Sequence, residues 1–247
     1  MSNHFVVNSG GDPTLPPHRF AEIPGNGNYR SGRIHSYEQM KLLRDQYGIR
    51  NIVNLAADAV WSQRDSRFNC GLSQRDQTQQ GNCTSKGGVR RSCPNACEPV
   101  WAADLGINYL FFPLGGRGPQ AQQWSEIKSA LIQGHTLIHC TAGVDRTGAT
   151  VARWKRAVEG TGDAEIMSYT KSFGGAWESP RDDNRRLREW LLAGSYEAET
   201  AAAMDRAKQS DNSLAWVNVQ KDTATWVGLG ALWVAGGGLL WWSLRRK

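Results

Sequence analysis

The sequence lacks two features that would place it in common classes of protein. It contains no nucleic-acid-binding motif, and its basic residues are scattered rather than gathered in one stripe, so we expect no nucleic-acid partner. The first thirty residues do not show a charged stretch followed by an apolar stretch, so we expect no secretory signal peptide. The net charge of +6 favours anionic partners such as phosphorylated substrates or acidic lipid, with ordinary surface charge as the alternative.

Cysteine is also scarce, with 5 residues in 247, and four of them lie in one stretch. That stretch, residues 58–100, is polar and has little periodicity, so we interpret it as an insertion within a larger domain. Its cysteines are Cys70, Cys83, Cys93 and Cys97. They can form a structural zinc site, form two disulfides or remain free thiols. Their spacing lacks the paired C-x2-C knuckles of common zinc sites, so all three alternatives stay open.

The fifth cysteine lies in residues 139–148, His-Cys-Thr-Ala-Gly-Val-Asp-Arg-Thr-Gly. A short apolar run, Thr136–Ile138, precedes this segment and predicts a buried strand. A helical pattern over residues 148–158 follows it. Cys140 is therefore expected on a tight turn between a strand and a helix, with Arg146 six positions later.

This arrangement predicts a phosphate-binding loop. A turn that enters a helix points backbone N–H groups inward, and the helix dipole adds partial positive charge. Gly143 permits a backbone conformation that a β-carbon would hinder, and Arg146 can bind two phosphate oxygens with its planar fork. The same field favours thiolate over thiol at Cys140, and Thr147 can donate its hydroxyl to that sulfur. The alternative is a buried structural cysteine beside a surface arginine.

Cys140-x5-Arg146-Thr147, preceded by His139, resembles the signature loop of the cysteine-dependent protein tyrosine phosphatases. Residues 29–33, Tyr-Arg-Ser-Gly-Arg, resemble the entry segment of bacterial and atypical dual-specificity members, which is a strand and turn beside the active site. The resemblance implies an α/β fold with a central, mainly parallel sheet flanked by helices, and catalysis without a metal or other cofactor.

The resemblance also assigns residues to the site. It implies that His139 fixes hydrogen bonds of the loop and stabilises the thiolate. The residues expected to bind phosphate are Thr141, Ala142, Gly143, Val144, Asp145 and Arg146.

The sequence departs from the family at the general acid. Most members use an aspartate in a loop about thirty residues before the cysteine, but the matching loop here, residues 114–118, contains no carboxylate. Asp104 precedes the neighbouring strand and is expected at its wrong end. Asp58 and Arg117 are further candidates for the site.

Asp145 offers a replacement acid. Residues 142–147 resemble the GKDRTG loops of bacterial lipid-and-protein phosphatases and the GWDRT loops of myotubularins, in some of which the loop aspartate has the acid role. We therefore predict Asp145 as the acid, with orientation of Arg146 or of a loop amide as its alternative function.

Outside the loop, periodic patterns predict the remaining elements. Ser36-x-x-Gln39 matches a capping box that opens a helix ended by Gly48, and residues 49–55 and 107–112 predict strands. Trp124, Ile127 and Leu131 share one face of a further helix. Asp163 is expected to cap one more helix, and residues 179–183 are expected to start another.

The predicted organisation has four parts. Residues 1–28 are expected to be a flexible arm, residues 29–194 the phosphatase-like domain with its insertion, and residues 195–222 a helical linker. Residues 223–244 are uncharged and apolar, long enough to cross a bilayer, and carry tryptophans near both ends. A buried helix of the domain is the alternative. The simplest topology is a C-terminal membrane anchor with the catalytic domain in the cytoplasm, although the terminal basic cluster opposes that orientation.

The sequence thus predicts a membrane-anchored phosphatase acting on phosphotyrosine or phosphoserine/threonine proteins, or on phosphoinositides. The alternatives are a non-catalytic phosphate-binding scaffold protein and an inositol polyphosphate phosphatase.

Overall fold

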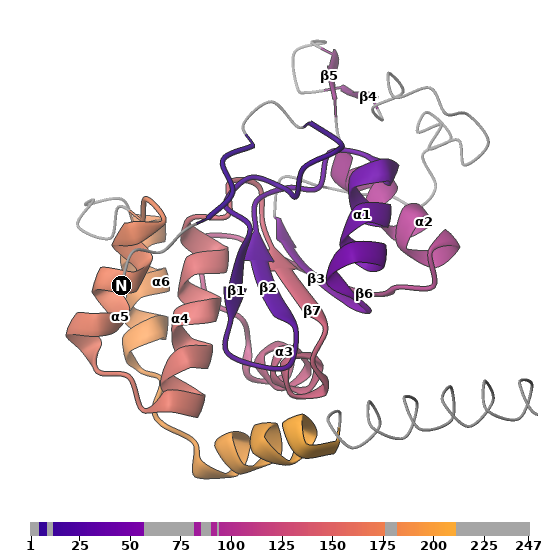
Figure 1. The fold of residues 1–247 in the computed structure, drawn as a ribbon. Helices are drawn as coiled ribbons and strands as arrows, with labels where there is room; N and C mark the ends of the chain where they lie inside the picture. The colour runs from indigo at the N-terminus through magenta and orange to yellow at the C-terminus, as the bar shows by residue number, and fades with distance from the viewer. Residues whose placement is uncertain are drawn as a thin grey trace, which may run out of the picture. The chain divides into compact units, whose positions relative to one another are not determined.

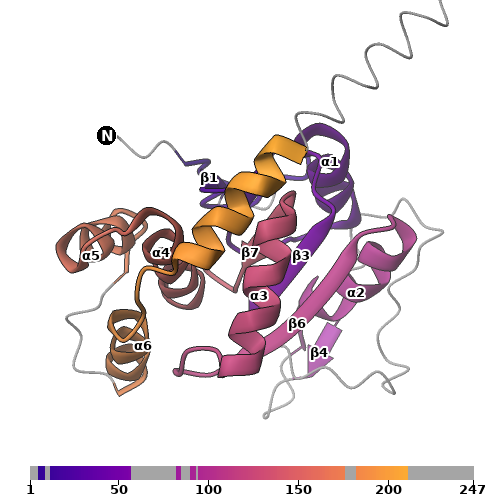
Figure 2. The same cartoon turned by 90° about the horizontal axis from the view of Figure 1, so that it is seen from below.

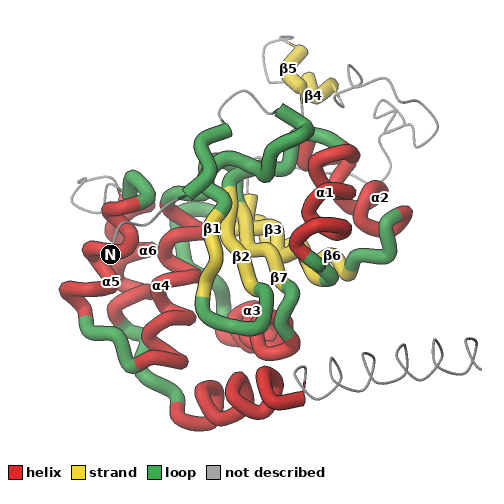
Figure 3. Tube along the Cα trace, viewed as in Figure 1, coloured by secondary structure: helices red, strands yellow, loops and turns green. Residues whose placement is uncertain are grey.

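The computed structural model describes residues 5–8, 12–56, 82–84, 90–92, 94–175 and 182–210. The chain forms two compact units, Met1–Met204 and Asp205–Lys247, and the fold that carries the site is that of the first unit. Figures 1 and 3 show its elements. In chain order they are β1 (Ala21–Ile23), β2 (Asn28–Ser31), α1 (Tyr37–Tyr47), β3 (Asn51–Ala56), β4 (Asn82–Thr84), β5 (Arg90–Ser92), α2 (Pro94–Asp104), β6 (Asn108–Leu114), α3 (Ala121–Gln133), β7 (Thr136–His139), α4 (Asp145–Glu159), α5 (Asp163–Ser172) and α6 (Asp182–Leu192).

The central sheet has five strands in the order β1-β2-β7-β3-β6, and β4 and β5 form a separate antiparallel pair. Strands β2, β7, β3 and β6 are parallel, and only β1 is antiparallel to its neighbour. The predicted α/β fold with a mainly parallel sheet is therefore confirmed. Because the four parallel strands end at one edge, the residues that follow them are brought together there, which is where ligands bind in such sheets.

Both faces of the sheet are covered, as expected for parallel strands. In β3, Ile52 packs with α1 and α2, whereas Val53 and Leu55 pack with α3 and α4. Figure 2 shows α3 along one face of β7 and β3. Helices α5 and α6 pack on α4 rather than on the sheet. The alternation in β3 shows a strand buried on both sides, with every residue buried.

The local signals for α1 hold in the structure. The Ser36 side chain accepts a hydrogen bond from the Gln39 N–H, and Gly48 ends the helix in the left-handed conformation at φ 68°. In a capping box, the side chain at the third helical position accepts from the N–H of the N-cap residue. Here the Gln39 side chain accepts instead from the N–H of His35, one residue before the N-cap.

Three elements differ from the sequence predictions. The stretch 1–28, expected to hold no helix or strand, contains β1, and Phe20 and Ile23 within it are buried. Helix α2 begins at Pro94, inside the stretch interpreted as an aperiodic insertion. Gly162 rather than Asp163 is the N-cap of α5. The first two depend on contacts with distant parts of the chain, which local patterns do not reveal.

The compact unit also continues past Gly194, the predicted domain end. Residues 198–204 are helical, the Glu197 N–H donates to the Ala157 carbonyl at 3.0 Å, and Met204 is buried in the core. The predicted membrane span, residues 223–244, lies outside the described residues. Within the described part of the chain, no helix is both long and apolar enough to cross a membrane.

Candidate active site

A strand, a short loop and a helix form the site, as predicted. Strand β7 ends at His139, residues 140–144 form the loop, and α4 begins at Asp145. The helix starts three residues earlier than predicted, so Asp145, Arg146 and Thr147 all lie in its first turn. The backbone N–H groups of that turn lack helical partners, and the helix dipole adds partial positive charge beside the loop.

The loop carbonyls point toward the N-terminal segment. Three consecutive carbonyl oxygens accept hydrogen bonds from it: that of Thr141 from the Arg33 N–H (3.1 Å), that of Ala142 from Arg19 Nη1 (3.0 Å) and that of Gly143 from Arg30 Nη2. In a trans peptide the next N–H points the opposite way from the carbonyl. The amides of residues 142–144 therefore point away from the N-terminal segment, as a phosphate-binding loop requires.

Gly143 is required where it stands. Its φ is +70°, in the region that favours glycine. A β-carbon built there would lie 2.6 Å from the Gly32 nitrogen and 2.7 Å from the Ser31 carbonyl. Both are backbone atoms of the turn after β2, so a side chain would push that turn away from the loop.

The Arg30 side chain supports the loop. It is fully buried, its guanidinium lies 3.6 Å from the centroid of the Phe173 ring, and Nη1 donates to the Tyr169 hydroxyl at 3.2 Å. Stacking between aromatic rings orients the planar fork that donates to the Gly143 carbonyl. Residues 29–33 do form a strand and turn beside the site, but nothing in the sequence distinguishes Arg30 from an exposed basic residue.

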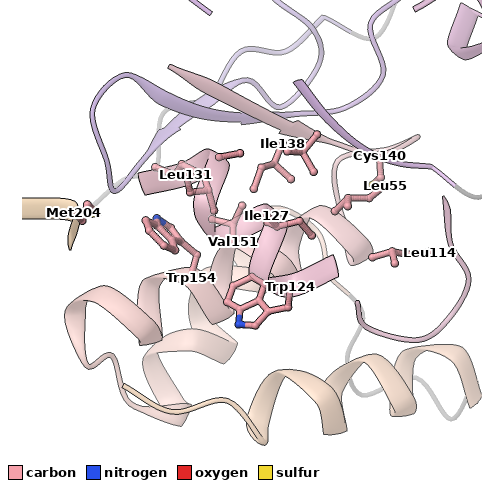
Figure 4. Packing of buried hydrophobic residues seen from close by; sticks show 13 residues of the cluster. Leu55, Leu114, Trp124, Ile127, Leu131, Ile138, Cys140, Val151, Trp154 and Met204 are labelled. Carbon is pink, nitrogen blue, oxygen red and sulfur yellow. The ribbon is translucent and has the colours of Figure 1, made fainter. Parts of the chain in front are cut away.

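Cys140 is a free, buried thiol, with 2% of its surface exposed. It belongs to the core cluster under α3 and α4, and Figure 4 shows it beside Leu55. The base of the site is therefore apolar. In such surroundings, electrostatic interactions are stronger than in water.

Arg146 joins the loop to the ends of two neighbouring strands. Its Nη1 donates to the carbonyls of Leu55 in β3 and Leu114 in β6, both at 3.4 Å, and Nη2 donates to Thr141 Oγ1 at 3.5 Å. These long contacts hold the guanidinium at the carboxyl edge of the sheet, where it can exchange them for a phosphate.

Thr147 and Asp145 flank Arg146 in the first turn of α4. The Thr147 hydroxyl is buried, and no residue in the described part of the chain forms a hydrogen bond with it. It is therefore available to a substrate or a thiolate, which keeps its predicted function open. Asp145 is half-buried. Its predicted role as the acid stays a prediction.

His139 is buried behind the loop, beside a residue that the sequence did not single out. The His139 Nδ1 lies 3.5 Å from the Cys140 carbonyl oxygen, and Nε2 lies 3.1 Å from Oε2 of Glu98. Neither side chain is exposed. Glu98 lies on α2, within the stretch interpreted as an insertion. A carboxylate in a polar, aperiodic stretch carries no signal of burial, so only the structure could identify it.

The loop after β6 lies where the family resemblance places the acid. Leu114, at its start, accepts from Arg146, yet residues 115–119 contain no carboxylate. Arg117 is exposed on this loop. Asp104 hydrogen-bonds the Tyr37 hydroxyl at 2.5 Å before β6 begins, so it lies at the opposite edge of the sheet, as predicted. Asp58 lies outside the described residues.

The predicted cysteine cluster is not tested by the structure. Cys70 and Cys93 lie outside the described residues, as do the side chains of Cys83 in β4 and Cys97 in α2. Among the described residues, no group of three or more potential metal ligands lies together. Zinc, disulfides and free thiols remain alternatives for these four residues.

Comparison with known proteins gives similarity in structure alone. No protein-family model and no curated protein sequence matches the chain. The solved structures that resemble it include the catalytic core of the PP-IP phosphatase Siw14 from S. cerevisiae, with 15% identity over 82% of this chain and 96% of that one, at a TM-score of 0.48. TpbA from P. aeruginosa, in complex with phosphotyrosine, has 15% identity over 78% of this chain and 93% of its own, at 0.45.

Tk-PTP has 16% identity over 70% of this chain and 93% of its own, at a TM-score of 0.44. At these identities and scores, the similarity concerns the fold alone. The chain is similar in structure to these three proteins, and residues 139–148 remain the feature that resembles the phosphatase signature loop.

Proposed function

We propose that this protein is a cysteine-dependent phosphatase that hydrolyses phosphomonoesters through a cysteinyl-phosphate intermediate. One observation carries the proposal: the carbonyls of residues 141–143 all bond the N-terminal segment, so the amides of residues 142–144, in the loop that joins Cys140 to Arg146, are directed away from it. A loop that leaves three successive amides free of the N-terminal segment, beside a cysteine and an arginine, fits a tetrahedral dianion.

The reaction has two steps. The Cys140 thiolate attacks phosphorus in line, the ester P–O bond breaks, and the leaving oxygen takes a proton from a general acid. Arg146 and the loop amides hold the equatorial oxygens and stabilise the charge that develops on them. Water then attacks the cysteinyl-phosphate, the P–S bond breaks, and inorganic phosphate leaves. Thr147 can donate its hydroxyl to the departing sulfur.

Asp145 is the acid that we propose. It lies one residue from Arg146, in a site where the loop after β6 offers no carboxylate. A general acid has to be protonated to donate, so we expect the rate with substrates that have poor leaving groups to fall as the pH rises.

For the substrate, we propose phosphotyrosine or phosphoserine/threonine proteins, or phosphoinositides. The net charge of +6 favours anionic ligands. A membrane anchor at residues 223–244 would place the site near lipid headgroups, and basic charge would add to attraction toward anionic lipid. A panel of phosphopeptides, phosphoinositides and inositol polyphosphates, assayed with the full chain in detergent micelles, would identify the class by its kcat/KM.

The test of the mechanism is the turnover of an aryl phosphate by the full chain and by Cys140→Ser. We expect the variant to lose at least about a thousandfold in kcat, because serine lacks the anionic nucleophile. Retention of the unmodified rate in Cys140→Ser would contradict the proposal. A chain that binds vanadate through residues 140–146 but turns over no phosphoester in the panel would instead be a phosphate-binding scaffold.

A further inference from the structure

We propose that Arg30 is a second cation of the phosphate site, whose buried charge acts on the bound anion through the peptide between Gly143 and Val144. The inference rests on the proposed function, because it concerns the anion that the loop would bind. Arg30 reaches the loop through a carbonyl oxygen rather than through the ligand. It is therefore a positioning residue, and it makes the site selective for dianions over monoanions.

The first observation is a buried positive charge without a carboxylate beside it. The Arg30 side chain is fully buried, and a guanidinium stays protonated in proteins. Its contacts among the described residues are the Tyr169 hydroxyl, the Gly143 carbonyl and the rings of Tyr169 and Phe173. Nε has no hydrogen-bond partner among these residues. Buried charges are normally paired, so this guanidinium suits a counter-charge that a ligand brings.

The second observation is the direction of the peptide that Arg30 binds. Nη2 donates to the Gly143 carbonyl, and none of the described peptide bonds is cis. The Val144 N–H therefore points the opposite way, away from Arg30. A cation at the carbonyl end polarises the peptide and makes this N–H a stronger donor to an anion. Val144 is also the N-cap of α4, where the helix dipole adds partial positive charge.

The third observation is that Arg30 lies on the face of the sheet that carries Cys140. In the parallel pair of β2 and β7, Arg30 is the register partner of Ile138. Ile138 and Cys140 belong to one core cluster, and Tyr169, which accepts from Arg30, packs against that cluster. Tyr29, the preceding residue of β2, packs on the opposite face. The charge of Arg30 thus acts through a buried region, where solvent weakens Coulomb attraction less than at the surface.

The consequence is a preference for ligands that carry two negative charges. Coulomb attraction is proportional to the charge of the ligand, so a dianion gains twice as much from Arg30 as a monoanion in the same place. A phosphomonoester is a dianion near neutral pH, whereas a phosphodiester is a monoanion. Arg30 therefore adds to Arg146 in selecting monoesters, although only Arg146 is placed to touch the phosphate.

The test compares two tetrahedral oxyanions of similar size, tungstate and perrhenate. Tungstate is a dianion at mildly alkaline pH, and perrhenate is a monoanion. Their affinities for the full chain in detergent micelles are measured by isothermal titration calorimetry. In Arg30→Gln, which removes the charge, we expect the ratio of tungstate affinity to perrhenate affinity to fall by about tenfold. In Arg30→Lys, which keeps the charge, the ratio should stay within about threefold of the unmodified chain.

Two control variants separate the charge from packing. Tyr169→Phe keeps the charge of Arg30 and removes the hydroxyl that accepts from Nη1, so the ratio should not change. Arg153→Gln removes a half-buried arginine of α4 that stacks on Trp190, and it should also leave the ratio unchanged. An equal loss of affinity for both anions in Arg30→Gln overturns the proposal, because a displaced loop weakens both alike. A matching fall of the ratio in Arg153→Gln overturns it as well.

Arg146→Met decides the matter if Arg30→Gln does not fold. This variant retains Arg30, so it should still prefer tungstate, and loss of all preference overturns the proposal. Because binding requires no turnover, the outcome is separate from that of the proposed function. A ratio that depends on Arg30 in a chain that hydrolyses no phosphomonoester would support Arg30 and contradict the phosphatase. Turnover that requires Cys140, with an unchanged ratio in Arg30→Gln, would do the reverse.

Discussion

Two loops at the carboxyl edge of the sheet differ sharply in how they are held. In the loop after β7, residues 140–144, three consecutive carbonyls bond the N-terminal segment. The loop after β6, residues 115–119, contains three glycines and lies against α6, where a β-carbon on Gly118 would meet the Trp190 ring at 2.1 Å. The first loop is fixed by polar bonds that orient amides. The second is fixed by packing and presents no carboxylate.

The difference between the two loops separates anion binding from proton donation. Orientation of amides is needed for binding an anion, and the loop after β7 has it. The loop after β6 contains no carboxylate that could donate a proton, so we look for the proton donor on α4. Four changes, from the largest expected effect to the smallest, test this division between the two loops.

Replacing Arg146 should have the largest effect. Arg146→Met removes the guanidinium that reaches both loops, and we expect kcat/KM for an aryl phosphate to fall by about a thousandfold or more, because the charge on the equatorial oxygens loses its partner. Steady-state kinetics of the full chain measures this. Arg50→Met, at the opposite edge of the sheet, is the control and should stay within about twofold. Equal losses in both variants would count against Arg146 as a ligand for phosphate.

Asp145→Asn should have the second largest effect. If Asp145 supplies the proton, kcat for an alkyl phosphate should fall by about a hundredfold, while an aryl phosphate with a good leaving group is affected much less. The ratio of the two rates, measured across pH, is the readout. A uniform loss on both substrates would assign Asp145 to the orientation of Arg146 instead.

Matched glycine variants compare the two loops directly. Gly143→Ala places a β-carbon at positive φ and 2.6 Å from backbone, so vanadate affinity should fall by about tenfold to a hundredfold. At Gly115 a β-carbon meets nothing within 4 Å, so Gly115→Ala should leave the affinity unchanged. Titration with vanadate, monitored by protein fluorescence, distinguishes them. Equal affinities in both variants would mean that the loop after β7 is not the binding loop.

Two arginines, Arg30 (buried) and Arg153 (half-buried), give the smallest contrast. Arg30 donates to the loop after β7, whereas Arg153 stacks 4.3 Å from the Trp190 ring and donates to the Trp190 carbonyl at 2.9 Å. Arg30→Met should weaken vanadate binding by about tenfold, because a charge-assisted hydrogen bond is lost. Arg153→Met should lower the melting temperature but retain affinity. Loss of affinity in Arg153→Met alone would reverse the assignment of the two loops.

The features that could be predicted from the sequence are those that depend on residues close together in the chain. Residues 136–148 contain a buried strand, a glycine at positive φ and a helix start, all visible as local patterns, and the fold class follows from the same reasoning. The two residues that the sequence did not identify, Arg30 and Glu98, make contacts with residues that are far away along the chain. Arg30 bonds a carbonyl 113 residues away, and Glu98 joins the site only because α2 packs on the sheet. No local pattern distinguishes either side chain from a solvated one.

The most direct test of the account is a search for phosphate on Cys140. The full-length Asp145→Asn variant is mixed with an aryl phosphate and quenched in acid during the first turnover, and its peptides are examined by mass spectrometry. We propose that Asp145, once it has given up its proton, also accepts a proton from the attacking water, so its loss slows hydrolysis of the intermediate. We therefore predict a phosphorylated Cys140 peptide that is absent from the same variant carrying Cys140→Ser. Turnover with unmodified Cys140 at every quench time, and an undiminished rate in Cys140→Ser, would contradict it.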